Sequence, residues 1–299
     1  MSGTDGGVVS HAEALDGVRG GGAHGLGAAG GGIPAARAGG AETFYLALGT
    51  SLAVGFQPNR GETSKGYVDV LWRRMAQQIP GLSLENVGCP GETSSSMITG
   101  THPHCRYPEG SQLDAAVAFL HAHPAQVAFI TVEVGANDFI GACLRDTGRL
   151  DRACASDVLP RIQARLTRIV DALAAAAPAV PIVGMTYYDP LLGLWGLVPG
   201  GRALARADAR IWADLNETFA TAYGDAGATV ADVAATFQVD DFTDTVVVPG
   251  RGELPVNVAN ACRWTWFCSP RYATDPHANA VGYRKIADTF NQAIQAVLP

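Results

Sequence analysis

The sequence predicts an α/β fold in which a five-stranded parallel sheet is covered by helices on both faces. Two observations support this prediction: short apolar runs alternate with amphipathic stretches, and 47% of the residues are hydrophobic whereas 16% are charged. Strands separated by helices form right-handed crossovers, which make the strands parallel and bury both faces of the sheet. Of the 299 residues, a body of about 260 is long enough to bury a large core.

The first half of the body supplies three strands and two helices. Residues 43–48 (TFYLAL) form an apolar, aromatic-rich run, residues 83–87 (SLENV) a short strand, and residues 126–134 (QVAFITVEV) a central strand rich in β-branched residues. Residues 67–79 carry apolar side chains at helical spacing, and residues 111–121 also fit a helix. Because strands and helices alternate here, crossover connections are expected.

The second half continues the alternation with two strands and three helices. Residues 158–177 have an amphipathic pattern that ends before prolines, and residues 181–187 (PIVGMTY) then form a strand. Residues 203–223 indicate another helix, residues 228–232 (ATVAD) the last strand, and residues 279–297 a closing helix. In such sheets ligands bind at the carboxyl ends of the strands, so the chemically informative residues should follow the strands.

The first 40 residues differ in composition from the rest. They hold 14 of the 36 glycines, so the remaining residues have an ordinary glycine content. Glycine and alanine leave little side chain to bury, and we therefore predict that residues 1–40 are disordered and that residues 41–299 form one domain. The segment lacks the basic start and apolar stretch of a signal peptide.

Charge and motifs exclude several functions. A net charge of −7 gives no basic surface for nucleic acid, and no apolar run is long enough for stable membrane insertion. Neither a G-x-G-x-x-G nor a P-loop motif follows the first strand, so no nucleotide cofactor is expected. Two H-x-H pairs occur, at His102 and His104 and at His121 and His123, without a nearby acidic cluster. We therefore expect no cofactor and no metal.

Six cysteines fall into three neighbouring couples. An even count with local grouping suggests disulfides, and sequential pairing is the first choice among the 15 possible connectivities. The couples are Cys89 with Cys105, Cys143 with Cys154, and Cys262 with Cys268. The alternative is six buried thiols in an intracellular enzyme. Disulfides would indicate an oxidising compartment, so we expect a secreted protein although no signal peptide is evident.

A serine follows the first predicted strand. Ser51 lies in the sequence Gly49-Thr50-Ser51, where a helix is expected to begin. N–H groups at a helix N-terminus can stabilise a developing oxyanion, which suits a nucleophile. The alternative is that Ser51 only caps the helix.

Three further candidates follow the second and third strands or precede the last helix. Gly88 and Gly91 mark a loop where the backbone approaches another group closely. Asn137 has a side-chain amide that can donate to an oxyanion. His277 opens the closing helix and can act as a base. For the two loop segments, the alternative is a plain turn.

Taken together, these blocks of serine, glycine, asparagine and histidine resemble the SGNH subgroup of the GDSL hydrolases over residues 45–283, and the disulfide couples look most like secreted bacterial lipases and esterases of that family. The resemblance implies a flavodoxin-like three-layer fold and serine-dependent ester hydrolysis. It makes Ser51 the nucleophile and His277 the general base. Ser51, Gly91 and Asn137 then form the oxyanion hole.

The sequence departs from the family pattern at two positions. The first block usually reads Gly-Asp-Ser, but Thr50 replaces the aspartate here. The family usually has D-x-x-H, which would put the acid at Thr274, whereas Asp275 lies two residues before His277. Either Asp275 orients the imidazole from a shifted loop or a backbone carbonyl does so. We expect Asp275 to complete the triad.

Apolar segments near the predicted site suggest an acyl-binding wall. Residues 191–198 (LLGLWGLV) include Leu194 and Trp195, and Trp266 lies inside the last cysteine couple. We predict that these three side chains contact the substrate, a small-molecule or lipid ester with an apolar acyl group. The alternative is a loop that packs on the core. We expect a monomer. An acyltransferase or carbohydrate deacetylase on the same residues remains an alternative, and a non-catalytic binding module is a third.

Overall fold

A parallel five-stranded sheet is the centre of the computed structural model, which describes residues 42–298. The strand order is β2-β1-β3-β4-β5, the order of flavodoxin-like folds. The strands are β1 (Thr43–Leu48), β2 (Leu82–Asn86), β3 (Val127–Val132), β4 (Ile182–Met185) and β5 (Thr229–Ala231). The predicted fold class is confirmed. The predicted disordered segment, residues 1–40, lies outside the described residues.

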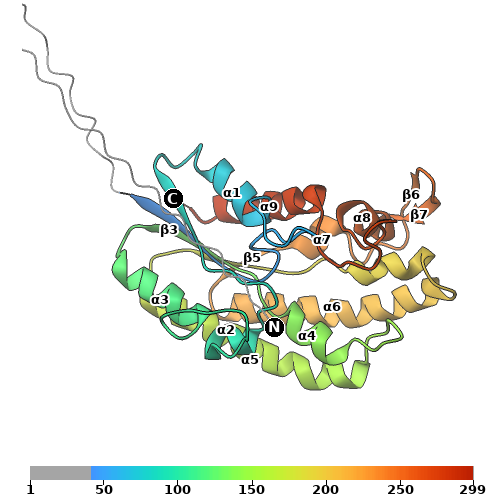
Figure 1. The fold of residues 1–299 in the computed structure, drawn as a ribbon, viewed down its shortest axis with the longest axis horizontal. Helices are drawn as coiled ribbons and strands as arrows, with labels where there is room; N and C mark the ends of the chain where they lie inside the picture. The colour runs from blue at the N-terminus through green and yellow to red at the C-terminus, as the bar shows by residue number, and fades with distance from the viewer. Residues whose placement is uncertain (1–41, 299) are drawn as a thin grey trace, which may run out of the picture. The chain divides into compact units, whose positions relative to one another are not determined.

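Helices cover both faces of the sheet (Figure 1). One layer contains α1 (Tyr67–Met75), α7 (Val233–Phe237), α8 (Val256–Trp264) and α9 (Ala280–Gln295). The other contains α2 (Ser94–Thr99), α3 (Gln112–Ala122), α4 (Ala136–Cys143), α5 (Arg152–Ala176) and α6 (Gly201–Asp225). A 3₁₀ helix, η1 (Pro190–Gly196), precedes α6, and an antiparallel hairpin of β6 (Thr245–Val248) and β7 (Gly252–Pro255) precedes α8.

The structure corrects three details of the sequence prediction. The helix predicted to begin at residue 158 begins at Arg152, because the Asp151 carboxylate accepts hydrogen bonds from the first free N–H groups of α5. No helix begins at Ser51, since residues 51–55 form tight turns. The glycine-containing apolar segment predicted as a pocket wall forms η1, in which Leu191 and Leu192 are buried.

The sheet brings the loops after β1, β2 and β3 together. Leu48 is paired with Val132 across the parallel ladder. Just beyond the strands, the Glu133 N–H donates to the Leu48 carbonyl at 3.1 Å, and the Val87 N–H donates to the Ala47 carbonyl at 2.9 Å. The chain segments that follow these three strands therefore leave the sheet side by side, at the edge where ligands bind in such folds.

Three disulfides join the cysteines in the pairs that their grouping in the sequence predicted. Cys89 bonds to Cys105, Cys143 to Cys154, and Cys262 to Cys268. The second of these joins the end of α4 to the start of α5, and the third closes the loop that follows α8.

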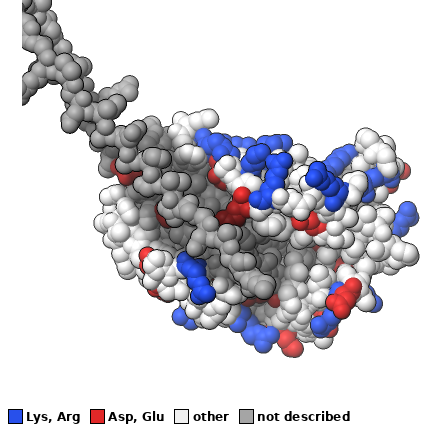
Figure 2. All heavy atoms as spheres, viewed as in Figure 1, with Lys and Arg blue, Asp and Glu red and all other residues white. Residues whose placement is uncertain are grey.

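On the face that Figure 2 shows, the described surface carries charges of both signs. Basic side chains occur there in several groups with acidic side chains between them. Among residues 42–298, no helix has the length and apolar character that crossing a membrane requires.

Candidate active site

Ser51 lies in a tightly wound turn directly after β1. The Phe56 N–H donates to the Ser51 carbonyl at 2.9 Å, and the Ala53 N–H donates to the Thr50 carbonyl at 3.2 Å. The residue before this turn is held from α3, because the Gly49 N–H donates to Gln112 Oε1 at 2.7 Å. These bonds fix the backbone on both sides of the serine, so its hydroxyl occupies a defined position at the carboxyl end of the sheet.

His277 connects Ser51 to Asp275. Its Nε2 lies 3.0 Å from Ser51 Oγ, and its Nδ1 lies 2.9 Å from Asp275 Oδ1. The same carboxylate oxygen accepts the His277 backbone N–H at 3.0 Å. With the Nδ1 proton directed to the carboxylate, Nε2 is free to accept the serine proton, which is the arrangement of a Ser-His-Asp triad.

The backbone at Thr274 explains why an acid two positions before the histidine reaches it. Thr274 has a φ of +69°, in the left-handed region that β-branched residues rarely adopt. The Thr274 N–H donates to the Phe267 carbonyl and the Asp275 N–H to the Tyr272 carbonyl, which hold this unusual turn. The turn directs the Asp275 carboxylate, and not the Thr274 side chain, toward the imidazole.

The histidine loop is also held from other directions. The Phe56 ring packs on the imidazole with centroids 4.6 Å apart. The Tyr188 hydroxyl donates to the Pro276 carbonyl at 2.9 Å, and the backbone N–H of Trp266 donates to the His277 carbonyl at 2.9 Å. The imidazole therefore has little freedom to leave the serine.

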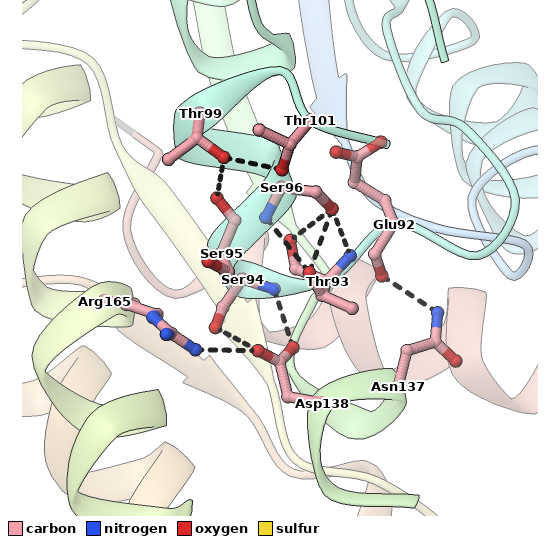
Figure 3. A network of polar contacts seen from close by, with 10 residues as sticks. All are labelled: Glu92, Thr93, Ser94, Ser95, Ser96, Thr99, Thr101, Asn137, Asp138 and Arg165. Atoms are coloured by element: carbon pink, nitrogen blue, oxygen red, sulfur yellow. Dashed lines mark hydrogen bonds and ion pairs between the residues drawn. The ribbon is translucent and has the colours of Figure 1, made fainter. Parts of the chain in front are cut away.

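Asn137 lies in the first turn of α4 and is oriented by the loop after β2. Its Nδ2 donates to the Glu92 carbonyl at 2.9 Å, as Figure 3 shows. A side-chain amide has two hydrogens, so the second remains available to another acceptor. Gly91, next to this carbonyl, has a φ of +83°, and a Cβ there would lie 2.9 Å from His102 Nε2. The backbone conformation therefore favours glycine, and a larger residue would also displace the His102 side chain.

A polar network joins this loop to α4 and α5 (Figure 3). Asp138 accepts from the Ser94 N–H at 2.6 Å and from the Ser94 hydroxyl at 2.7 Å, and Arg165 lies 3.2 Å from the same carboxylate. The Thr93 side chain caps α2. Because Asp138 is the neighbour of Asn137, the network sets the relative positions of the asparagine and the glycine loop.

One pocket combines three of the predicted site residues. Ser51, Asn137 and His277 line it, and its volume is about 60 Å³. The rest of its wall is mostly apolar or aromatic and consists of Leu52, Ala136, Ile140, Tyr187, Tyr188, Pro190, Trp212 and Pro276, with Thr50 and Glu133 as polar members. Gly91 and Asp275 are not on the wall, although Asp275 is bonded to His277.

The three side chains predicted to contact the substrate lie elsewhere. Leu194 is buried in η1. Trp195 stacks on Phe242 at 5.8 Å, and the Trp266 Nε1 donates to Gln57 Oε1 at 3.1 Å. None of the three lines the pocket, because Leu194 is buried in the core, Trp195 packs on Phe242 and the Trp266 indole is bonded to Gln57. Ile140 and Trp212 line the pocket instead.

Sequence reasoning missed Glu133. This residue follows β3, is 1% exposed and accepts hydrogen bonds from Thr50 and Tyr187. Burial raises its pKa to about 7, and the hydrogen bonds from Tyr187 and Thr50 oppose that rise. The available signal was an acidic residue within the apolar run of residues 126–134.

One group of side chains has the composition of a metal site. Potential ligand atoms of Cys89, Glu92, His102 and Cys105 lie within 4.8 Å of one another. The two sulfurs, however, are bonded to each other. Glu92 and His102 remain, whereas structural zinc sites use four protein ligands.

The fold and the site define the class of protein. A five-stranded sheet in flavodoxin-like order, with a serine after β1 and a histidine before the last helix, is the SGNH hydrolase α/β fold. The chain matches the model of the GDSL-like lipase/acylhydrolase family over residues 47–285, and it belongs to that family. The resemblance expected from the sequence is thereby confirmed. No curated protein sequence matches the chain.

Solved structures share the fold at low sequence identity. A lipase from a goat rumen metagenome is 14% identical, with a TM-score of 0.53 over 84% of this chain and 97% of that chain. An extracellular lipase from Streptomyces rimosus is 18% identical, with a TM-score of 0.51 over 84% of this chain and 99% of that chain.

Proposed function

We propose that this protein is a serine-dependent carboxylic ester hydrolase. The observation that carries the proposal is the continuous hydrogen-bonded path from Ser51 Oγ through His277 to Asp275. In the proposed reaction His277 takes the serine proton while Ser51 attacks the ester carbonyl. The alcohol then leaves with that proton, and water, activated by the same imidazole, releases the acid from the acyl-enzyme.

The oxyanion of the tetrahedral intermediates is stabilised by donors around Ser51. The free hydrogen of the Asn137 amide and the N–H groups of Ser51 and Gly91 supply them in this proposal. Support comes from the placement of Asn137 on the same pocket wall as Ser51 and from the Glu92 carbonyl that orients its amide.

The pocket favours a short acyl chain. Its volume of about 60 Å³ has room for only several water molecules, and Ile140 and Trp212 form part of its wall. We therefore propose esters with acyl groups of about two to four carbons as the preferred substrates, which narrows the apolar acyl group expected from the sequence to short chains. An acyltransferase or carbohydrate deacetylase would use the same residues with a different acceptor or substrate.

A series of p-nitrophenyl esters tests both parts of this proposal. We expect kcat/KM to be highest for short acyl groups and to fall for octanoate and longer chains. Ile140→Ala should shift the preference toward longer chains because it enlarges the pocket. Ile98→Ala is the control, since Ile98 is a half-buried residue of α2 that does not line the pocket. A preference for long chains in the unmodified protein contradicts the pocket assignment, and hydrolysis unaffected by Ser51→Ala contradicts the function.

We also propose that the protein is secreted. Its three disulfides are of the kind that persists in oxidising compartments. A related fold occurs in an extracellular lipase. Thiol titration of the denatured, unreduced protein should find no free sulfhydryl, and six reactive thiols would contradict this assignment.

A further inference from the structure

Glu133 places a buried carboxyl group directly behind the turn that carries Ser51. It is 1% exposed, and it lines the same pocket as Thr50 and Ser51. Its backbone N–H donates to the Leu48 carbonyl at the end of β1. This hydrogen bond fixes the backbone of Glu133 to β1, the strand that leads into the serine turn.

The carboxyl group is surrounded by hydrogen-bond donors. Its Oε2 accepts the Thr50 N–H at 2.9 Å, and the Thr50 hydroxyl lies 3.0 and 3.1 Å from the two oxygens. The Tyr187 hydroxyl donates to Oε1 at 2.5 Å. Within residues 42–298 no Lys, Arg or His side chain forms an ion pair with it. Hydrogen bonds alone stabilise the ionised form, and two of the donors belong to the residue before Ser51.

Gly49 has no side chain and therefore leaves room for the Glu133 carboxyl group. A Cβ at that position would lie 2.7 Å from Ala53 Cβ and 3.0 Å from Glu133 Oε2. Any larger residue would therefore displace either the serine turn or the carboxyl group. Glycine at position 49 therefore permits the close approach of the serine turn to Glu133.

We propose that Glu133 is a positioning residue for Ser51: its ionised carboxylate holds the amide and hydroxyl of Thr50, and loss of that charge lowers the reactivity of the serine. The proposal rests on the proposed ester-hydrolysing function. Glu133 acts through Thr50 and does not itself contact the reacting atoms.

His277 lines the same pocket as Glu133, and five tyrosines interact electrostatically with the carboxyl group. The tyrosines come from α1, the segment after β4, α6 and α9: Tyr67, Tyr187, Tyr188, Tyr223 and Tyr283. Burial raises the pKa of each of these tyrosines, so they stay neutral. Glu133, with its pKa raised to about 7 by burial, changes charge near neutral pH.

Protonation changes what the carboxyl group can accept. The Thr50 and Tyr187 hydroxyls can each reverse from donor to acceptor, but the Thr50 N–H can only donate. A protonated Glu133 must therefore donate to one of the hydroxyls, and it holds Thr50 less firmly. Activity should rise with pH as Glu133 ionises, so the acidic side of the log(kcat/KM) profile should include one ionisation that depends on Glu133.

Glu133→Gln tests this because glutamine keeps the shape of the side chain and cannot ionise. We expect kcat to fall roughly 10-fold, within the loss that a small misplacement of reacting groups produces, with KM nearly unchanged. The rate of Ser51 labelling by a fluorophosphonate should fall by a similar factor. The acidic limb should lose one ionisation, which a purely structural defect would not cause.

Tyr187→Phe and Tyr45→Phe form a matched pair of variants. Tyr187→Phe removes a donor that lowers the pKa of Glu133, so the acidic limb should move to higher pH. Tyr45 is also fully buried, but its hydroxyl bonds to Thr131 at 2.8 Å. Tyr45→Phe should therefore leave the profile in place. If Glu133→Gln does not fold, the shift of the acidic limb in Tyr187→Phe tests the proposal instead. The absence of that shift overturns the proposal.

Infrared spectroscopy gives a readout that does not depend on turnover. The carboxylic acid C=O band of Glu133 should titrate near pH 7 in Ser51→Ala protein and be missing from the double variant with Glu133→Gln. The proposal is overturned if no such band is lost, or if Glu133→Gln keeps the original acidic limb and labelling rate. Absence of Ser51-dependent hydrolysis and labelling in the unmodified protein is a different result, which overturns the proposed function itself.

Discussion

Asp275 shows how one backbone conformation determines the role of a side chain. The left-handed conformation of Thr274 turns the chain so that the Asp275 carboxylate contacts both the Nδ1 and the backbone N–H of His277. A carboxylate in this position holds the imidazole in the tautomer that can accept the serine proton and stabilises the imidazolium that forms.

Asp275→Asn should lower kcat by about 10²–10⁴-fold because an asparagine amide permits the wrong histidine tautomer. KM should change little, since Asp275 does not line the pocket. Steady-state kinetics on a short-chain p-nitrophenyl ester measures both constants. The control is Asp171→Asn on the exposed face of α5. Near-full activity of Asp275→Asn would remove this residue from the proposed triad.

Single residues differ in how far the sequence could predict them. Ser51, Asn137 and His277 were predictable because each follows a strand or precedes the last helix. The choice between Asp275 and a backbone carbonyl as the partner of His277 depended on the φ angle of Thr274, which no residue type specifies. Glu133 was missed because its partners, Thr50 and Tyr187, are distant in sequence and meet only through the order of the strands.

At the scale of elements, the loop after α8 holds the segment that carries His277. The Trp266 N–H donates to the His277 carbonyl, and Thr265 forms an isolated antiparallel bridge with Ala278. The Cys262–Cys268 disulfide joins the last turn of α8 to the far end of this loop. The covalent link therefore constrains the segment that pairs with the histidine.

Removal of the Cys262–Cys268 disulfide should lower both stability and activity, whereas removal of Cys143–Cys154 should lower stability alone. The loop-entropy relation gives about 2–3 kcal/mol for either bridge. The Cys143–Cys154 bridge is the matched control because it connects α4 to α5. Double serine variants, compared by denaturant unfolding and by kcat, test this expectation. Equal effects on kcat would contradict a positioning role for the loop.

The length of an element decided whether the sequence could predict it. The long helices α5, α6 and α9 were predicted because their apolar periodicity extends over several turns. The short helices α2 and α7 and the hairpin of β6 and β7 were not. Their ends depend on local capping and tertiary packing, such as the Thr93 cap of α2 and the Asp232 cap of α7.

At the scale of the whole molecule, buried carboxyl groups make stability depend on pH. Burial raises the pKa of Asp189 to about 8, and its Oδ2 is buried without a hydrogen-bond partner. Burial also raises the pKa of Glu133 to about 7. Folded-state pKa values above the unfolded ones mean that the folded protein binds more protons between about pH 4 and 8. The stabilisation is therefore complete at low pH and is lost as pH rises through these values.

Asp189→Asn should reduce this loss of stability by a few kcal/mol. Asparagine still accepts the Leu191 N–H through Oδ1 and cannot ionise. The free energy of unfolding, measured by denaturant titration at pH 5 and pH 8, should fall less in the variant than in the unmodified protein. Asp171→Asn, at an exposed position, should keep the original pH dependence. An equal fall in Asp189→Asn and unmodified protein would show that Asp189 does not retain its proton.

Covalent labelling with a fluorophosphonate tests the central claim most directly. The hydrogen-bonded path from Ser51 through His277 to Asp275 predicts one phosphonyl adduct, located by mass spectrometry on Ser51. Labelling should be lost in Ser51→Ala and His277→Ala and retained in Ser156→Ala, an exposed serine of α5. No adduct, or an adduct on another residue that persists in Ser51→Ala, would contradict the assignment of Ser51 as the nucleophile.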